Sequence, residues 1–137
     1  MSSRPSRSHL HASRPATLAA VALGGALGSV LRWLLELALP QTSGWPWPTL
    51  LANVAGSAAL TWLVAHGDRH QHPRWVRPAV GTGLLGGFTT FSTYAVQVAV
   101  LGEVEPVMAL AYLVTTPVLC VLAAVLVGSL TLRGGGR

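Results

Sequence analysis

Four long apolar segments, separated by short polar stretches, follow one another along the chain. They cover residues 16–39, 49–65, 79–101 and 106–132. A bilayer core of about 30 Å needs about 20 residues of helix, so each segment suits one crossing; the second is short and the fourth is long enough to tilt. The pattern predicts an all-α membrane protein whose single domain, residues 16–132, contains four transmembrane helices.

The two ends of the chain differ from this domain. Residues 1–15 are rich in Ser, Arg, His and Pro, which is typical of a disordered basic tail, and residues 133–137 form a short basic C-terminal tail. A basic stretch before an apolar segment also describes a signal peptide. Arg32 and Glu36 interrupt the first segment and three more segments follow, which favours a transmembrane helix instead.

Composition agrees with lipid as the solvent. Of the 137 residues, 51% are hydrophobic and 9% are charged, whereas soluble domains carry about 25% charged residues. The net charge is +5, but the arginines lie at the ends of apolar segments and form no stripe interleaved with aromatic residues. A nucleic-acid partner is therefore not predicted. Cys120 is the only cysteine, which excludes an internal disulfide.

The arginines also predict how the chain sits in the cell (inner) membrane. Eight of the nine basic residues fall on one side of a four-helix path: Arg4, Arg7, Arg14, Arg69, Arg74, Arg77, Arg133 and Arg137. The two loops on the other side contain no basic residue and include Glu103 and Glu105. By the positive-inside rule, both termini of this multi-pass protein are expected in the cytoplasm.

The third segment contains an unusual run, GGFTTFSTY, at residues 86–94. Glycines let neighbouring backbone approach closely, and Gly-Gly followed by paired threonines predicts a break at the centre of this helix. Broken membrane helices expose backbone groups that can hold ions. The alternative is an unbroken, tightly packed helix whose hydroxyls bond their own carbonyls. The residues alone leave both open.

Polar side chains also lie deep in the second and fourth segments. Asn53 is in the middle of the second, where an amide either bonds another helix or faces a pore. Tyr112, Thr116 and Cys120 are spaced by four and so share one helix face. They form either a polar track along that face or hydroxyls bonded to the preceding turn.

Two further positions affect helix geometry and charge. Pro117 lacks a backbone N–H, frees the carbonyl of Leu113 and predicts a kink. Arg32 is expected near the cytoplasmic end of the first helix, with Glu36 one turn later. The pair is either an i,i+4 ion pair or the source of a vestibule charge that attracts anions.

Three motifs, GGALGSVLRW, TLLANVAGS and GLLGGFTTFSTY, occur in this order in a four-helix chain of this length. Together they resemble the Fluc (CrcB-type) fluoride channels over residues 20–128. The resemblance implies an antiparallel dimer of four-helix subunits with two narrow fluoride pores, and no enzyme activity. It also implies a structural Na⁺ at the dimer interface, held by the backbone carbonyls of Gly86 and Thr89.

The resemblance implies the site residues as well. It assigns eight residues to the pore lining: Asn53, Phe91, Ser92, Thr93, Tyr94, Tyr112, Thr116 and Cys120. Arg32 matches the arginine of the vestibule. Fluoride is small and holds its water tightly, so a pore must replace that water with N–H and O–H donors and with the partly positive edges of aromatic rings. These residue types meet that need.

The chain departs from the family pattern at four positions. Tyr94 stands where a second phenylalanine is usual, and its hydroxyl is expected to narrow or re-polarise that point. Cys120 replaces a hydroxyl with a weaker donor, Pro117 is unusual in the polar track, and Ala58 stands where a phenylalanine is typical. These departures predict that one of the two pore rows is impaired.

The resulting prediction is a fluoride-specific channel subunit that exports fluoride passively and lowers its cytoplasmic concentration. The arginine asymmetry favours one fixed orientation and hence a heterodimer with an oppositely oriented paralogue; a homodimer is the other possibility. One alternative is a non-conducting structural partner, favoured by Tyr94, Pro117 and Cys120. Another is a small multidrug exporter, which needs a deep membrane carboxylate, whereas Glu36 lies near a helix end.

Overall fold

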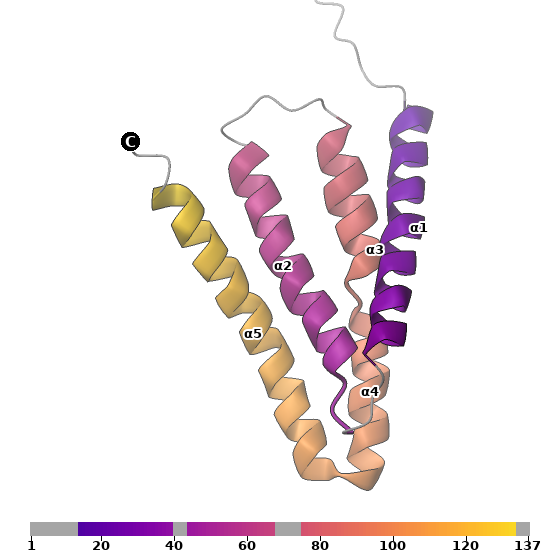
Figure 1. Ribbon diagram of the computed structural model, residues 1–137, viewed down its shortest axis with the longest axis vertical. Helices are drawn as coiled ribbons and strands as arrows, with labels where there is room; N and C mark the ends of the chain where they lie inside the picture. The colour runs from indigo at the N-terminus through magenta and orange to yellow at the C-terminus, as the bar shows by residue number, and fades with distance from the viewer. Residues whose placement is uncertain (1–13, 40–43, 68–74, 134–137) are drawn as a thin grey trace, which may run out of the picture.

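The computed structural model describes residues 14–39, 44–67 and 75–133. All of its regular elements are helical (Figure 1): α1 (Arg14–Ala38), α2 (Trp47–Gly67), the π-helix η1 (Arg77–Leu85), α3 (Gly86–Phe88), α4 (Phe91–Val104) and α5 (Pro106–Arg133). Together η1, α3 and α4 form one crossing, so four helical runs are long and apolar enough to span a membrane. The predicted all-α, four-helix architecture is confirmed, while residues 1–13 and 134–137 of the predicted tails lie outside the described part.

The helices pack in a defined order. α1 lies along η1 and α3, α2 lies along α5, and α4 packs on the first half of α5 across a tight turn. Figure 1 shows α2 between α5 and the third crossing. The centre of the third crossing therefore has α1 on one side and α2 on the other.

Close backbone contact between α1 and the third crossing depends on glycine. A methyl group at Gly28 would overlap the carbonyl oxygen of Leu84, and one at Gly87 would overlap the carbonyl oxygen of Gly25. Small residues allow this approach in membranes, where packing and not water exclusion drives helix association. The contact begins at η1, a π-helix that the sequence pattern did not predict.

A small buried core lies where α2, α4 and α5 meet. Leu50, Tyr94 and Tyr112 form its centre, and Trp45 and Val98 pack against it. Most large apolar side chains of α1 and α5 are exposed instead, as expected of helices that are hydrophobic all round and have lipid as their solvent. The core thus fixes α4, the part of the third crossing that follows the interruption, against α5.

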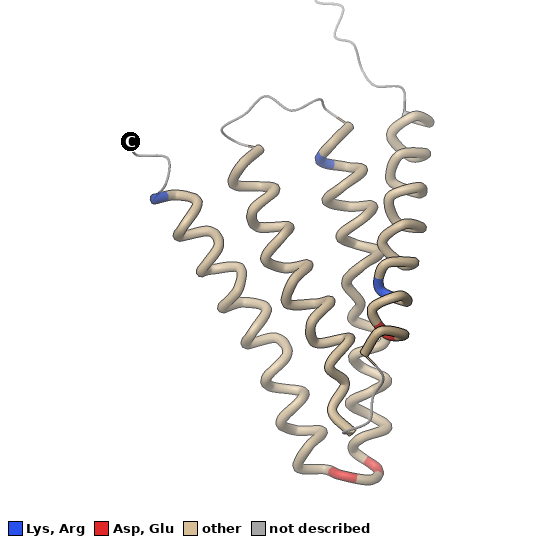
Figure 2. Tube along the Cα trace, in the orientation of Figure 1, with Lys and Arg blue, Asp and Glu red and all other residues tan. Residues whose placement is uncertain are grey.

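Apart from Arg32 and Glu36 on α1, the charged residues of the described helices lie toward the two ends of the bundle (Figure 2). Figure 2 shows basic residues where η1 starts and α5 ends, and acidic residues at the opposite end, around the α4–α5 turn. These are Arg77 and Arg133 on one side and Glu103 and Glu105 on the other. Other arginines of the asymmetry, Arg4, Arg7, Arg69, Arg74 and Arg137, lie outside the described residues.

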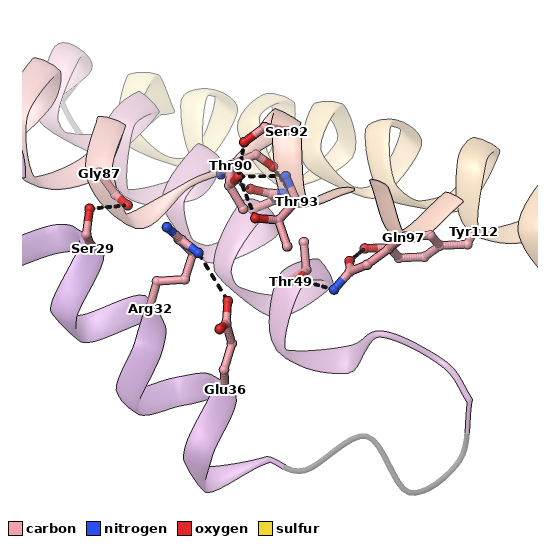
Figure 3. Close-up of polar contacts among 11 residues, drawn as sticks. Ser29, Arg32, Glu36, Thr49, Gly87, Thr90, Ser92, Thr93, Gln97 and Tyr112 are labelled. Atoms are coloured by element: carbon pink, nitrogen blue, oxygen red, sulfur yellow. Dashed lines mark hydrogen bonds and ion pairs between the residues drawn. The ribbon is translucent and has the colours of Figure 1, made fainter. Parts of the chain in front are cut away.

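The expected depth of Arg32 is wrong. α1 starts at Arg14, at the same end of the bundle as Arg77 and Arg133, and it ends at Ala38. Eighteen residues of helix rise about 27 Å, so Arg32 lies toward the opposite end of α1. It is therefore in the half of α1 that lies away from the basic chain ends, beside the middle of the third crossing (Figure 2, Figure 3).

Candidate functional site

The third crossing is interrupted at Thr89 and Thr90. Thr89 has φ −81° and ψ 154°, and Thr90 has φ −149° and ψ 125°, so both are extended. α3 ends just before them and α4 begins just after them. The predicted break is therefore present and is placed at the threonine pair, whereas the alternative of an unbroken helix is wrong.

The side chain of Asn53 holds the extended backbone in place. Its Oδ1 accepts from the Thr90 backbone N–H at 2.8 Å, and its Nδ2 donates to the Thr90 carbonyl at 3.0 Å. Gly56, one turn further along α2, leaves room for the Thr89 side chain, because a methyl group there would overlap Thr89 Cγ2. α2 thus supplies both the bonds and the space that the break requires.

The hydroxyl of Thr90, within the break, caps the start of α4, and the hydroxyls of the first turn of α4 gather around it. The Thr93 N–H donates to Thr90 Oγ1 at 3.1 Å, and the Thr90 hydroxyl donates to Thr93 Oγ1 at 3.1 Å. The Ser92 and Thr90 hydroxyls are 3.3 Å apart. Figure 3 shows this cluster gathered around Thr90. A threonine at the N-cap satisfies an N–H that would otherwise have no partner at the start of a helix.

These bonds divert two amides from the carbonyls that they would meet in a continuous helix. There, the Thr90 N–H would bond Gly86 O and the Thr93 N–H would bond Thr89 O. In the structure the first amide bonds Asn53 and the second bonds Thr90 Oγ1. The carbonyls of Gly86 and Thr89 are thereby left without their helical donors.

A groove of about 580 Å³ lies alongside the break. It is bounded by α2, by η1 to α4, and by α5, and its lining is mostly apolar. Among the residues expected in the pore or the metal site, it is lined by Asn53, Gly86, Thr89, Phe91, Tyr94, Thr116 and Cys120. The geometry is therefore a largely apolar passage with a few polar groups and aromatic rings at mid-helix depth.

Comparison with known proteins decides the family. The profile of the family described as "CrcB-like protein, Camphor Resistance (CrcB)" matches residues 19–129. The chain belongs to this family. The resemblance drawn from the three sequence motifs is confirmed, and family membership removes the multidrug-exporter alternative.

Several relatives are similar over most of this CrcB-family chain. It is 46% identical over 113 residues to "Fluoride-specific ion channel FluC 2" of Streptomyces avermitilis, and the aligned region covers 80% of this chain and 71% of that protein. It is 44% identical over 118 residues to the protein of the same name from Nocardia farcinica, covering 84% of each. It is 45% identical over 114 residues to "Fluoride-specific ion channel FluC" of Methanopyrus kandleri, covering 81% and 85%.

Within this CrcB-family fold, Thr116 is the polar side chain best placed to meet a ligand. It is 3% exposed, lines the groove, and its hydroxyl has no hydrogen-bond partner among the described residues. Cys120 lines the groove one turn later. Phe91 is 79% exposed, and its ring centroid lies 5.8 Å from that of Tyr94. A buried donor without a partner, in a groove that two aromatic rings also line, is suited to a small anion.

Three other residues of the predicted pore set lie outside the lining of the groove. Ser92 and Thr93 belong to the cap of α4, and Tyr112 is fully buried in the core. The Tyr112 hydroxyl donates to Gln97 Oε1 at 2.9 Å, and Gln97 Nε2 donates to Thr49 Oγ1 at 3.0 Å (Figure 3). The Tyr112 hydroxyl is therefore bonded to Gln97, and Tyr112 does not line the groove.

Gln97 and Thr49 were not among the predicted site residues. Gln97 is one of several polar residues in the third segment, and Thr49 is the first residue of the second. Their bonds link α2, α4 and α5. A glutamine in a membrane span was the available signal, since such a group needs a partner.

Arg32 lies on α1 and is not part of the groove lining. Its Nη1 lies 3.1 Å from Glu36 Oε1, and the two side chains are 23% and 33% exposed (Figure 3). Its Nε is buried and has no partner among the described residues. The i,i+4 ion pair is therefore formed, and it leaves the buried Nε–H of the guanidinium unused.

Proposed function

We propose that this chain is a subunit of a channel that conducts fluoride passively and so lowers its cytoplasmic concentration. The support is its CrcB family membership and relatives that are named fluoride-specific ion channels. The observation that carries the proposal is the groove at the helix break, where the unpartnered Thr116 hydroxyl lies with the Phe91 and Tyr94 rings. A channel carries out no covalent chemistry, in agreement with the prediction that the chain is not an enzyme.

The chemistry of fluoride matches this lining. A small, strongly hydrated anion crosses a membrane only when donors replace its water. Thr116 offers an O–H, Asn53 has a second N–H beyond the one bonded to Thr90, and ring edges of Phe91 and Tyr94 carry partial positive charge. With an apolar lining around these groups, larger or uncharged polar solutes gain little from entering.

The channel is proposed to be an antiparallel dimer. The groove is open on one side, and Phe91, which lines it, is 79% exposed in the single subunit. A second subunit inserted in the opposite direction would cover this face and enclose the passage. The partner is an oppositely oriented paralogue if the arginine asymmetry fixes this chain with both termini in the cytoplasm, and an identical copy otherwise.

A structural Na⁺ is proposed at the interface, held by the carbonyls of Gly86 and Thr89. The fit rests on the hydrogen bonds of the break, since Asn53 and the Thr90 hydroxyl take the amides that would otherwise occupy these oxygens. Hard cations prefer oxygen ligands, and unwound carbonyls within membrane helices coordinate Na⁺ in transporters. A bound Na⁺ would supply positive charge at the break.

The test is fluoride efflux from liposomes, first with this chain alone and then together with an oppositely oriented paralogue. Efflux only with the paralogue supports the heterodimer, and efflux from the chain alone supports a homodimer and overturns the fixed orientation. Absence of efflux from both preparations, with the protein folded, overturns conduction and favours a structural subunit. Replacing Na⁺ with a large organic cation during purification should destabilise the dimer.

A further inference from the structure

Tyr94 makes a hydrogen bond that a phenylalanine at this position cannot make. Its hydroxyl, on α4, donates to the backbone carbonyl of Leu113, on α5, at 2.6 Å. The bond joins two helices that also meet in the buried core, where the Tyr94 and Tyr112 ring centroids are 5.3 Å apart. The added hydroxyl is thus directed at the backbone of α5.

The accepting carbonyl is the one that Pro117 deprives of a partner. α5 runs from Pro106 to Arg133 with Pro117 inside it. In a helix the Leu113 carbonyl would accept from the N–H of residue 117, and proline has none. The Tyr94 hydroxyl takes the place of that missing donor. Two departures from the family pattern, far apart in the sequence, therefore meet at one carbonyl group.

The surroundings make this bond important for an anion. Tyr94, Leu113 and Pro117 all line the groove, which is mostly apolar, and Tyr94 is only 6% exposed. In such a setting a bare carbonyl has no water to bond, and its oxygen carries partial negative charge. An anion in the groove would be repelled by it. The bond also limits rotation of the Tyr94 ring, because the hydroxyl and the ring contacts on both sides restrain the side chain.

We propose that Tyr94 and Pro117 form a coupled pair, in which the Tyr94 hydroxyl covers the Leu113 carbonyl and holds the ring edge toward the groove. Tyr94 is then a positioning residue for anion passage, and its hydroxyl is not a donor to the ion. The part that concerns transport rests on the proposed fluoride channel. The part that concerns the hydrogen bond does not.

The test compares Y94F in two backgrounds, the natural Pro117 and P117A. In the Pro117 background, Y94F should slow fluoride efflux per folded protein about tenfold, because the buried Leu113 carbonyl then has no hydrogen-bond partner. In the P117A background the new backbone N–H covers the carbonyl, so the same substitution should change the rate by less than about twofold. The midpoint of thermal unfolding in detergent should show the same dependence on residue 117.

A matched control is Y112F, which removes the hydroxyl that donates to Gln97 and not to Leu113. Its effect should be equal in the two backgrounds. An equal effect of Y94F in both backgrounds, in melting and in efflux, would overturn the pair. If the effect of Y94F on the unfolding midpoint depends on residue 117 but its effect on efflux does not, the hydrogen bond stands and the positioning role is overturned. If no variant conducts, the channel proposal fails, while the melting data still decide the hydrogen bond.

Discussion

Asn53 pairs with the Thr90 peptide through both ends of its side-chain amide, accepting from the N–H at 2.8 Å and donating to the carbonyl at 3.0 Å. The side chain thereby acts as a neighbouring strand would toward an extended residue. In a bilayer core, where unpaired backbone groups are costly, this pairing lets two residues leave the helical conformation. The break in the third crossing therefore depends on a residue of the second.

Replacing Asn53 with alanine should remove this support. With two backbone groups of Thr90 unpaired, N53A should lose about 2 kcal/mol or more of stability, together with most fluoride efflux. Thermal unfolding in detergent and liposome efflux would measure the two effects. T61A is the control, because the Thr61 hydroxyl bonds the Ser57 carbonyl of its own helix. Wild-type melting of N53A would contradict the role assigned to this pairing.

Thr90 itself can be tested with a valine of similar shape. T90V removes the acceptor of the Thr93 N–H, and loss of an N-cap costs about 1 kcal/mol. The freed amide would then return to the Thr89 carbonyl, so we expect the Na⁺ dependence of dimer stability to weaken as well. T131V, which removes a hydroxyl bonded one turn back in α5, should leave that dependence intact. Unchanged Na⁺ dependence in T90V would argue against carbonyl coordination there.

Thr116 offers a test of conduction that should spare folding. Because its buried hydroxyl has no partner among the described residues, T116V should melt at or slightly above the wild-type temperature. Fluoride efflux should fall by roughly tenfold or more, the value of one hydrogen bond to a charged group. T116S keeps the hydroxyl and should retain most of the flux. Equal flux from T116V and T116S would remove Thr116 from the ion path.

Gly25 and Gly28, about one turn apart on α1, offer a matched pair of substitutions that tests the close contact between α1 and the third crossing. G28A places a methyl group on the Leu84 carbonyl oxygen, whereas the nearest atom to a methyl group at Gly25 is the Gly83 carbonyl oxygen at 3.9 Å. Overpacking of this kind costs about 1–3 kcal/mol. G28A should therefore melt clearly below G25A, and the reverse order would show that α1 and the third crossing are not packed as described.

The features that were predicted from sequence are those that one segment determines by itself. The four spans follow from apolar length, and the break follows from the glycines and threonines of residues 86–94. The π-helix at Arg77–Leu85 was missed because it is stabilised by packing against α1, and apolar periodicity does not separate it from an α-helix. The depth of Arg32 was misjudged although the helix direction alone determines it.

The bonds between helices could not be read from the chain. Asn53, Gln97 and Tyr94 were each recognisable as polar groups that need partners, but the partners are on other helices. Which atom each one meets depends on how the helices are rotated and offset against one another. Thus the sequence identified the Leu113 carbonyl as unpaired and Tyr94 as carrying an extra hydroxyl, and only the structure joins the two.

The interruption at Thr89 and Thr90 also brings two helix ends of opposite polarity together inside the membrane. The carbonyl end of the η1–α3 run carries about half a negative elementary charge, and the amide end of α4 carries about half a positive one. One short segment can therefore favour a cation on one side and an anion on the other. Residues 86–94 contain no side chain that titrates near neutral pH, so this polarity comes from the backbone and stays the same when the cytoplasm acidifies.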